Sequence, residues 1–544
     1  DNADVTWIGG YGKPGLPFFY PNQHPDQHIA VFDHTNPDRV WVGHDGGLSV
    51  TNNVRATDID WEFKNDGYNT TQFYTIALPR TPGDTRVMGG TQDNGTLYIN
   101  HTVQMNQDYW DLSSGDGSHA HFGDNFAYVS SQNGEVLQLD YHAIKLSLFD
   151  VSLGDPDTLI SAFQKPGSYW TYVHPRQKQF SLFIHPFVVS PIADSVMFFP
   201  DGRFLFRSTK LNKVLKNRDR NAILIPSEDQ IWTRLDSLAL PEDYIITALG
   251  YSTTNPVDRL YWGGSKFSPS DQPKIFRLDS AKLTETMDND FKDISIPAGI
   301  GPPSGSYLHN IAVNEKNGDE LIAVFSNYLI ESLYHSMDGG DNWIPVQGNI
   351  AGTDLFPGPS VRDAAIMQLD DETTLYIVGT SAGVFTTTEL NGNNTFWERE
   401  APGQIGFNVA DAIDVRLSDN VIAIGTHGRG MWIGNVQTSV SVEEDFITEA
   451  PVHFELKQNF PNPFNPSTNI QFVLSEPGTV TLQVFDVNGK RISTIINNEN
   501  RNSGQHTISF DASSLASGVY FYRINLTSNS GRSFSDVKRM TLIK

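Results

Sequence analysis

The sequence predicts an all-β protein, in which a β-propeller is followed by a small immunoglobulin-like β-sandwich. Short alternating apolar runs are separated by turns rich in Gly, Asn and Asp, and glycine is frequent, with 45 residues. A strand–turn–strand pattern recurs about every 54 residues, which is the size of a four-stranded propeller blade. Near the C-terminus the turns follow one another about ten residues apart, as in a β-sandwich. We therefore expect a propeller at residues 1–436, a linker at 437–452 and a sandwich at 453–544.

Eight copies of the pattern can be counted, each with two strand-like runs around a turn that usually contains glycine. They are residues 39–50, 86–99, 126–139, 195–207, 259–278, 320–343, 375–386 and 421–433. An eight-bladed ring is the preferred interpretation. Seven blades with a large insertion are the alternative, because the long irregular stretch 141–186 weakens the third copy. The last copy lacks a following strand, which the N-terminal run 5–8 could supply and so close the ring.

The sharpest turn is the segment SMDGGDNW at residues 336–343. Its pattern Ser-x-Asp-x-Gly-x-x-Trp resembles the Asp-box of sialidase-like propellers (BNR repeats). In that family the Trp packs between blades and the Asp holds the turn. The resemblance therefore implies a structural and not a catalytic role for Ser336, Asp338, Gly340 and Trp343, and the other seven turns are looser copies of the same hairpin.

The larger segment as a whole resembles secreted sialidase-like repeat proteins related to the sortilin and xyloglucanase propellers. The resemblance is carried by the segments 24–28 (HPDQH), 43–47 (GHDGG), 71–74 (TQFY), 89–96 (GGTQDNGT), 114–117 (SGDG) and 426–430 (THGRG). Proteins of this kind commonly have a further propeller segment ahead of the matching part. A glycosidase cleft between two propellers would then need residues outside this chain.

The C-terminal segment resembles the type A sorting domain of the type IX secretion system of Bacteroidetes-like bacteria. Its motifs lie at 458–468, 484–489, 515–523 and 538–544 and include Asn459, Pro461, Asn462, Pro463, Phe464, Asn465, Pro466, Gly518, Tyr520 and Lys544. The resemblance implies passage through the periplasm, contact with the secretion machinery, and release or attachment at the cell surface. Such domains are usually cleaved during export; a retained domain would have a structural or docking role.

Charge and composition exclude several classes of partner. The chain has 38 Lys and Arg against 63 Asp and Glu, a formal charge of −25, so nucleic acid and anionic membranes would repel it. It has no cysteine and therefore no disulfide, and no apolar run of about 18 residues that would insert into a membrane. The start at Asp1, without Met or an apolar leader, is expected of a processed product or an excised fragment.

Several His and Asp side chains are candidate metal ligands. His24, Asp26 and His28 alternate, so on an extended segment they share one face. Other candidates lie in or beside the glycine-rich turns, which we expect to gather at one end of the ring: Asp45, Asp93, Asp116 and His427. Imidazoles and carboxylates there could hold a divalent metal, and the oxygen-rich turn 92–94 would suit calcium. The alternative is that these groups only cap turns and hydrogen-bond locally.

The sequence does not select a catalytic pair. A glycosidase needs two carboxylates on either side of a sugar, and many acids are available. A sialidase would also need an Arg-Ile-Pro motif near its N-terminus, and the chain lacks it. The preferred function is therefore non-catalytic binding, adhesion or assembly outside the cell, with a glycan, another surface protein or a second copy as partner. The alternative is a glycoside hydrolase acting on an extracellular polysaccharide.

Overall fold

The computed structural model has two compact units, Asp1–Thr438 and Ser439–Lys544. It describes residues 7–544 except 11–19, 21, 66, 69, 101–109, 114, 141–169, 176–177, 191–192, 194, 214–230, 253, 255, 257, 267–270, 284–289, 353–357, 370–372, 437–454, 460–461, 475–476, 487–488, 503 and 529–532. The division between the units falls inside the stretch 437–452 that the sequence predicts as a linker, and this stretch lies outside the described residues.

Unit 1 is built from antiparallel sheets in chain order, each from consecutive strands. The first sheet has β1 (Gln27–Phe32), β2 (Val40–His44), β3 (Gly47–Thr51) and β4 (Glu62–Phe63), and the second has β5 (Arg86–Gly90), β6 (Thr96–Asn100) and β7 (Trp110–Asp111). The third sheet has β8 (Gly117–Phe122), β9 (Phe126–Ser131), β10 (Glu135–Asp140) and β11 (Trp170–Tyr172). The fourth sheet has β12 (Val188–Val189), β13 (Met197–Asp201), β14 (Phe204–Ser208) and β15 (Trp232–Arg234).

Four more sheets follow. They are β16 (Tyr244–Ser252), β17 (Arg259–Lys266), β18 (Lys274–Leu278) and β19 (Phe291–Asp293); β20 (Leu308–Val313), β21 (Leu321–Phe325), β22 (Leu333–Ser336) and β23 (Ile344–Pro345); β24 (Val361–Gln368), β25 (Thr374–Thr380), β26 (Gly383–Thr387) and β27 (Glu398–Arg399); β28 (Ala410–Arg416), β29 (Val421–Thr426) and β30 (Met431–Asn435). Short 3₁₀ turns lie at Gln132–Gly134, Leu211–Lys213, Asp236–Leu238, Gly348–Ile350 and Gly392–Asn394.

The eight predicted hairpins are all present, one in each sheet of unit 1. Six of them are the second and third strands of four-stranded sheets, whereas β5–β6 begins one three-stranded sheet and β29–β30 ends another. The all-β prediction is therefore confirmed. Among the described residues, no helix has the length and apolar character that crossing a membrane requires.

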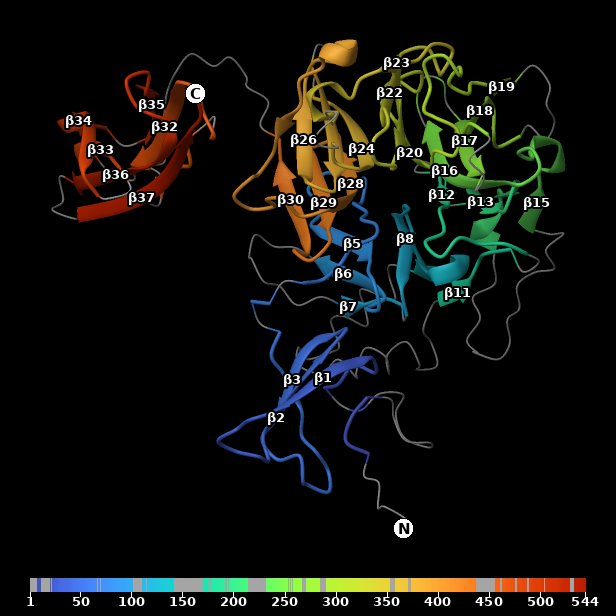
Figure 1. Cartoon of the computed structure of the whole chain (residues 1–544). Coiled ribbons are helices and arrows are strands. Elements are labelled where there is room, and N and C mark those ends of the chain that lie inside the picture. Colours follow the sequence, from blue (N-terminus) through green and yellow to red (C-terminus); the bar gives the residue numbers. More distant parts are fainter. Residues whose placement is uncertain are drawn as a thin grey trace. The chain divides into compact units, whose positions relative to one another are not determined.

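Seven of these sheets form the ring. The segment 73–78 bridges to β5 through Phe73–Thr91 and Ala77–Met88, so it is the innermost strand of the first ring blade. The same segment packs on the last sheet, because Ile76, Leu78 and Val87 share one apolar cluster with residues of β28 and β29. Figure 1 shows β5, in blue, beside β29, in orange. First and last blades thus close the ring, and neither leaves an apolar face in water.

Hydrogen bonds reinforce this closure. The Leu78 amide donates to Asp414 Oδ2 (2.7 Å), and the Phe73 amide donates to the Thr426 carbonyl (3.0 Å). Arg416 is 3% exposed; its Nη1 donates to the carbonyls of Pro79 (3.1 Å) and Asp84 (2.9 Å). Its Nε and Nη2 grip the Asp419 carboxylate at 2.7 and 2.9 Å.

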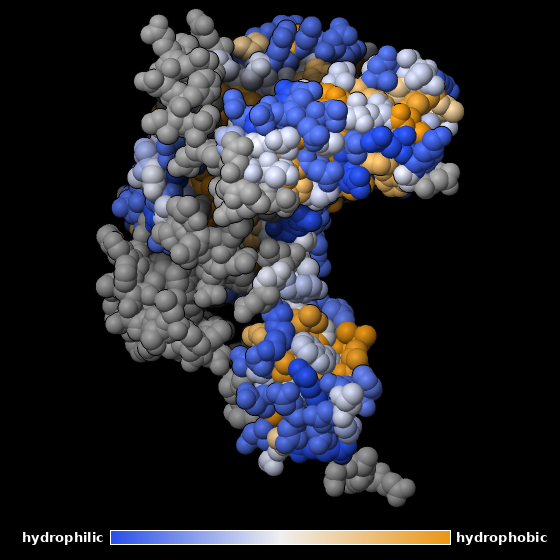
Figure 2. Space-filling model, turned by 90° about the vertical axis from the view of Figure 1, so that its left-hand side faces the viewer, coloured by the Kyte–Doolittle hydropathy of each residue, from blue (hydrophilic) through white to orange (hydrophobic). Residues whose placement is uncertain are grey.

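The first sheet, β1–β4, is not part of the ring. It has a small core of its own, formed by Val40, Val42, Ile59 and Trp61. Every residue of β1 is exposed, including Ile29, Val31 and Phe32 at 60, 51 and 61%. Figure 2 shows apolar side chains, in orange, on the lower part of the molecule, where Figure 1 draws this sheet. The ring therefore has seven blades and not the preferred eight, although eight hairpins are present.

The expected ring closure by residues 5–8 is not what the structure shows. Residues 5 and 6 lie outside the described part, and the Ile8 carbonyl accepts a hydrogen bond from Trp61 Nε1 (2.7 Å) in the first sheet. The same bond recurs between neighbouring blades, from Trp232 to Val173 (3.0 Å), Trp343 to Ile294 (2.8 Å) and Trp397 to Val346 (2.9 Å). The N-terminal run thus follows the blade pattern, but it packs on β1–β4 and not on the last blade.

Unit 2 is a two-sheet sandwich, as predicted. One sheet has the order β31 (Glu455–Leu456), β32 (Ser467–Leu474) and β35 (Gly504–Asp511). The other has β34 (Arg491–Arg501), β33 (Gly478–Phe485), β36 (Gly518–Ser528) and β37 (Ser533–Leu542). Residues from both sheets form one core, in which Ile470, Leu482 and Tyr522 are fully buried. The alternating burial of β32, β33 and β36 is the period-two pattern that the sequence displays.

Replacing Arg416 by Lys tests the closure of the ring. Lys keeps the charge but cannot donate to two carbonyls and grip a carboxylate at the same time. We expect the free energy of unfolding to fall by about 1.5–3 kcal/mol, the contribution of buried hydrogen bonds to charged groups. Urea denaturation followed by tryptophan fluorescence measures it. The matched control is Arg55→Lys, because Arg55 is 73% exposed and pairs with the exposed Asp38. Equal losses in the two variants would contradict this account.

Candidate functional site

The Asp-box forms a turn held by its own side chains. Ser336 Oγ accepts from the Gly340 amide (2.9 Å), and Asp338 Oδ1 accepts from the Asn342 amide (2.8 Å). Burial raises the pKa of the Asp338 carboxyl, but the hydrogen bonds from Asn342 and Ser336 outweigh it and hold that pKa below its usual value. Gly340 has a φ of 90°, and a Cβ there would meet the Ile294 side chain at 2.4 Å. Trp343 is 5% exposed and packs with residues of the preceding blade.

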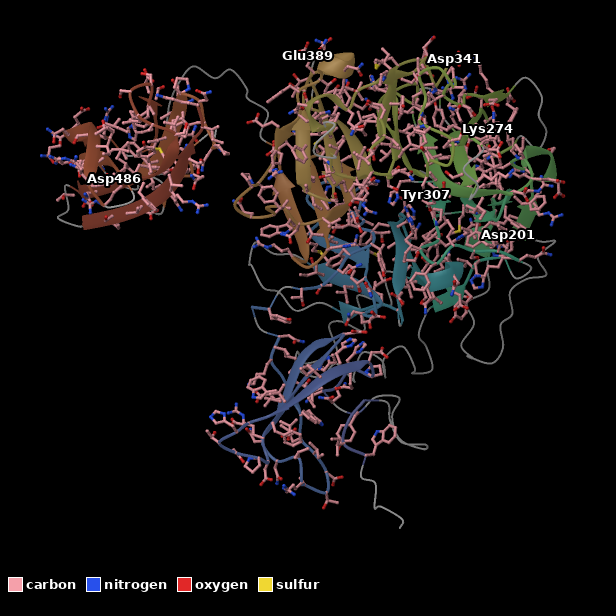
Figure 3. All side chains as sticks on the ribbon, in the orientation of Figure 1. Asp201, Lys274, Tyr307, Asp341, Glu389 and Asp486 are labelled. Carbon is pink, nitrogen blue, oxygen red and sulfur yellow. The ribbon has the colours of Figure 1, made fainter. Side chains whose placement is uncertain are left out.

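The Asp-box is not equivalent to the other glycine-rich turns, as the sequence had suggested. It connects the third and fourth strands of its blade, β22 and β23, whereas the turns at Asp45, Asp93 and His427 connect second and third strands. Because successive strands are antiparallel, these two kinds of turn lie at opposite ends of a blade. Figure 3 shows Tyr307, just before the inner strand β20, toward the middle of the ring and Asp341 of the Asp-box at the outer rim.

Three of the predicted metal ligands come together. One ligand atom from each of His24, Asp26 and Asp45 lies within 4.8 Å of the other two. His24 Nδ1 is 3.8 Å from Asp26 Oδ2, and the Asp45 amide donates to the Asp26 carbonyl (3.2 Å). His28 is exposed, and its Nε2 contacts Asp45 Oδ1. The Asp45 carboxylate, first through its hydrogen bond and then through its charge, raises the pKa of His28 above its usual value.

Asp93 and Asp116 lie beside this group, on the first two blades of the ring. The Asp93 amide donates to Asp116 Oδ1 (3.2 Å), and the Asp93 carbonyl accepts from His24 Nε2 (3.1 Å). Burial, and then the negative charges of Asp116 and Asp45, raise the pKa of the Asp93 carboxyl. The same surroundings raise the pKa of Tyr74 to about 12, first through burial and then through Asp116 and Asp93.

His427 belongs to a different group from the other candidates. Its Nε2 contacts Asp411 Oδ2 on β28, and its ring meets that of Tyr74 edge-on at 6.5 Å. His427 is not among the side chains whose ligand atoms come together around His24. The glycine-rich turns lie at one end of the ring, as expected. Among the described residues, however, their His and Asp side chains form two separate clusters.

Sequence reasoning missed the polar residues that reach the middle of the ring. Strands β20, β24 and β28 each have a β-bulge, and the residues left unpaired are His309, Arg362 and Asp411. A bulge redirects a side chain. Burial lowers the pKa of His309 to about 4, so this imidazole is neutral at neutral pH. No sequence pattern marks a bulge, because it adds one residue without a change in residue type.

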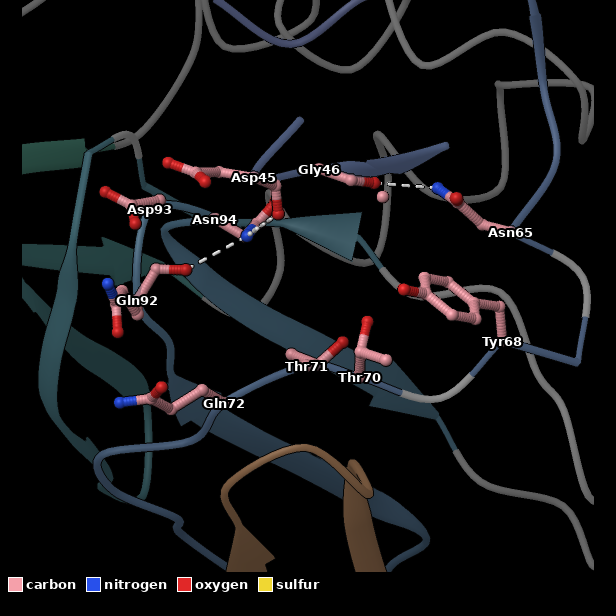
Figure 4. A pocket seen from close by; sticks show the side chains of 11 residues that line it. Asp45, Gly46, Asn65, Tyr68, Thr70, Thr71, Gln72, Gln92, Asp93 and Asn94 are labelled. Atoms are coloured by element: carbon pink, nitrogen blue, oxygen red, sulfur yellow. Dashed lines mark hydrogen bonds between the residues drawn. The ribbon is translucent and has the colours of Figure 1, made fainter. Parts of the chain in front are cut away.

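A polar pocket of about 200 Å³ lies beside the His24 group, between the first sheet and the first ring blade. It is lined by Asp45, Gly46, Gly47, Asn65, Tyr68, Thr70, Thr71, Gln72, Gln92, Asp93 and Asn94. Figure 4 shows Asp45 and Asp93 on one side and Tyr68 on the other. Asn94 Nδ2 donates to the Asp45 carbonyl (3.2 Å) and to the Gln92 carbonyl (2.9 Å), and Asn65 Nδ2 donates to the Gly46 carbonyl (2.8 Å).

The pocket contains residues from three of the segments that carry the family resemblance: 43–47, 71–74 and 89–96. Asn65, Tyr68 and Thr70 were not singled out from the sequence. The sequence marks these three residues as site candidates only by their place in the connection between the first sheet and the segment 71–74. A junction between two structural elements of this kind forms a concave surface.

The sorting-domain residues are mostly structural in unit 2. Asn459 is 2% exposed; its amide donates to the Tyr522 hydroxyl (2.7 Å) and its Nδ2 to Thr468 Oγ1 (2.9 Å). Phe464 is buried and bridges to Leu542, while Asn462 Oδ1 accepts from the Thr541 amide (2.8 Å). The last motif therefore packs on the first, and Lys544 Nζ donates to the Ser513 carbonyl (2.5 Å).

The remaining residues of the motif lie around this contact. Tyr520 donates its hydroxyl to the Ala516 carbonyl (2.8 Å), Gly518 begins β36, and the Pro466 carbonyl accepts from the Ala512 amide (2.9 Å). Pro463 and Asn465 flank Phe464, and Pro461 lies outside the described residues.

Comparison with known proteins identifies the C-terminal unit. Residues 458–534 match the secretion system C-terminal sorting domain. This unit directs the protein through the type IX secretion system to the cell surface or the extracellular space, and so implies contact with the secretion machinery. The predictions of export and localisation are thereby confirmed. No curated protein sequence matches the chain.

Solved structures with a similar arrangement of strands include three propeller-like examples. The β-propeller domain of a Myceliophteria thermophila protein is 12% identical, with 67% of this chain and 97% of that chain covered and a TM-score of 0.39. A computationally designed protein is 10% identical, with 76 and 96% covered and a TM-score of 0.35. The Niastella koreensis GH74 enzyme is 12% identical, with 74% of this chain and 48% of that chain covered and a TM-score of 0.42.

The variant Asp338→Ala tests whether the Asp-box has a structural role. Loss of the hydrogen bonds to Ser336 and Asn342 should lower the free energy of unfolding by about 0.5–1.5 kcal/mol. The folded-state pKa of Asp338 is depressed, so this contribution is complete above the unfolded value of 3.8 and is lost as the pH falls through the folded-state pKa. Wild type and variant should therefore converge in acid unfolding scans. Asp58→Ala, on an exposed loop, is the control and should change neither stability nor pH dependence.

Proposed function

We propose that this secreted protein is a non-catalytic binding protein that holds a neutral, hydroxyl-rich ligand, a glycan, in the pocket beside Asp45 and Asp93. The observation that carries the proposal is the lining of the pocket. Nearly all of its side chains are amides, hydroxyls or carboxylates, and Tyr68 is its single aromatic residue. Binding of this kind at the cell surface would serve adhesion or the assembly of extracellular material.

The chemistry of the lining favours a sugar over an apolar ligand. Side-chain amides such as those of Gln72, Gln92 and Asn94 offer both donors and acceptors, as sugar hydroxyls require. Tyr68 is 47% exposed, so its ring is available to pack against the face of a sugar. With a formal charge of −25, the protein would repel an acidic polysaccharide. A neutral glycan is therefore the ligand class that fits best.

The size of the pocket limits what it can hold. Its volume of about 200 Å³ is below the range of roughly 300–1,000 Å³ that is typical of sites for drug-sized ligands. A chain end or a single sugar residue is thus the expected occupant. Affinity for a polysaccharide would then depend on many weak contacts with repeated units or on several copies of the protein at one surface.

The pocket variants Tyr68→Ala and Gln92→Ala test this proposal. Each variant removes one hydrogen bond or one stacked ring, which contributes about 1 kcal/mol to the free energy of binding, so binding should weaken roughly fivefold. An array of neutral and acidic polysaccharides provides the probes, and titration calorimetry with each bound probe gives the affinity. Tyr328→Ala and Gln404→Ala are matched exposed controls outside the pocket. Binding of acidic polysaccharides only, or equal binding by pocket and control variants, would refute the proposal.

A glycoside hydrolase is the second candidate, and one observation favours it. Burial, and then the charges of Asp116 and Asp45, raise the pKa of the Asp93 carboxyl, and the Asp93 backbone amide donates to Asp116 Oδ1 (3.2 Å), so two carboxyl groups lie close together. Such a pair is the pattern that glycosidases use for general acid and base or nucleophile. Both residues belong to turns at the same end of the first two blades.

Asp93→Asn and Asp116→Asn distinguish hydrolysis from binding. If the protein is a hydrolase, release of reducing ends from a polysaccharide should fall at least a hundredfold in either variant, the usual contribution of general acid–base catalysis. If it is a binding protein, wild type should release none while both variants remain folded. Asp58→Asn is the control for an unrelated change of charge. Turnover that survives in both Asp93→Asn and Asp116→Asn would exclude this pair as the catalytic acids.

A further inference from the structure

We propose that His24, Asp26 and Asp45 bind a divalent transition-metal ion of the zinc type where the first sheet meets the first ring blade. One ligand atom from each lies within 4.8 Å of the other two. In a tetrahedral zinc site, ligands at about 2.0–2.2 Å from the ion lie about 3.3–3.6 Å apart, so side-chain rotations that move these atoms by about an ångström complete the site. Asp26 is 48% exposed and free to make that movement.

The hydrogen bond on the far side of His24 prepares this imidazole as a ligand. Its Nε2 lies 3.1 Å from the Asp93 carbonyl, which can only accept, so Nε2 carries the proton. Nδ1 therefore presents a lone pair, 3.8 Å from Asp26 Oδ2. Metal-binding histidines are characteristically fixed in this way, with one ring nitrogen donating to a carbonyl and the other on the metal. The amide of Asp26 is the present hydrogen-bond donor to Nδ1, at 3.3 Å.

The charges around the group are not balanced by a permanent cation. Within the described part of the chain, the ion pairs of Asp26 and Asp45 are with His24 and His28 and include no Lys or Arg. Asp93 and Asp116 add two more carboxylates nearby, since the Asp93 carbonyl accepts from His24 Nε2 (3.1 Å) and the Asp93 amide donates to Asp116 Oδ1 (3.2 Å). A divalent cation would neutralise the negative potential that these side chains share.

A buried imidazole beside the turn provides a second, independent observation. His44 is 6% exposed and stacks on His24 at 6.0 Å, and its Nε2 lies 2.8 Å from Ser49 Oγ. Among the described residues its Nδ1 has no hydrogen-bond partner. This nitrogen faces Gly46, next to Asp45, because a Cβ on Gly46 would lie 3.2 Å from it. A buried nitrogen without a partner is costly, and a water molecule on the ion would give it one.

The ligand types select the ion. Imidazole together with carboxylate suits zinc and its neighbours, whereas calcium takes six to eight oxygen ligands. The calcium site that the sequence suggested at residues 92–94 is therefore not the one proposed. His28, whose Nε2 contacts Asp45, is placed to support that carboxylate from outside.

Metal binding would also fix one wall of the pocket. Asp45 lines the pocket and receives the hydrogen bond from Asn94, and His24 donates to Asp93. An ion on His24 and Asp45 would thus hold the turn at Asp45–Gly46 against the turn at 92–95. This last step depends on the proposed glycan function, whereas binding of the ion does not.

The test is titration calorimetry of the untagged full chain with Zn²⁺ after treatment with a chelator and dialysis. We expect one ion per chain, bound at least tenfold more weakly by His24→Ala and by Asp26→Asn. Asp26 is exposed, so its amide variant should fold, and circular dichroism verifies this. Asp60→Asn, the same change of charge at an exposed position just before β4, is the matched control and should bind as the wild type does.

Three outcomes would overturn the proposal. They are no binding of Zn²⁺ by the wild type, binding that is unchanged in both His24→Ala and Asp26→Asn, and binding of Ca²⁺ in preference to Zn²⁺. The test is independent of the proposed function, since an ion can bind while every polysaccharide fails to. If a polysaccharide does bind, repeating that titration with and without Zn²⁺ measures the coupling, and a several-fold higher affinity with Zn²⁺ is the expected result.

Discussion

The contact between the segment 73–79 and strands β28–β30 is the constraint on which the rest of the propeller depends. Each blade buries its apolar faces only against its two neighbours, so an open ring would leave two faces in water. Ile76 and Leu78 fill one side of this joint, while Asp414 and Arg416 satisfy the backbone groups that the joint removes from solvent. Closure also brings the first and last blades together and so places His427 against Tyr74.

The sequence predicts the hairpins well because a tight turn between two alternating runs is a local signal. All eight copies form hairpins, one in each sheet of unit 1. It does not predict which sheets join the ring, because β2–β3 has the same local pattern as the others. Ring membership is decided by which faces meet, and the exposed side chains of β1 differ from the buried inner strands only through their neighbours. The fourth strands are short, often two residues, and their periodicity is correspondingly weak.

The candidate site, too, could be predicted from the sequence only in part. Asp45 and Asp93 could be predicted to meet because both lie in turns between second and third strands, which share one end of the blades. His24 and Asp26 could be placed on one face by alternation alone, but their proximity to Asp45 depends on how β1 pairs with β2. The Asp-box was grouped with these turns because its residues are similar. Only a count of strands within the blade shows that it lies at the other end.

Three apolar side chains on β1, those of Ile29, Val31 and Phe32, are in contact with water. They attract one another between molecules, whereas the formal charge of −25 keeps molecules apart. The repulsion acts over about 10 Å at 0.1 M salt and over only about 3 Å at 1 M. Added salt therefore weakens the electrostatic repulsion between two molecules of the protein and leaves the apolar surface of β1 unchanged.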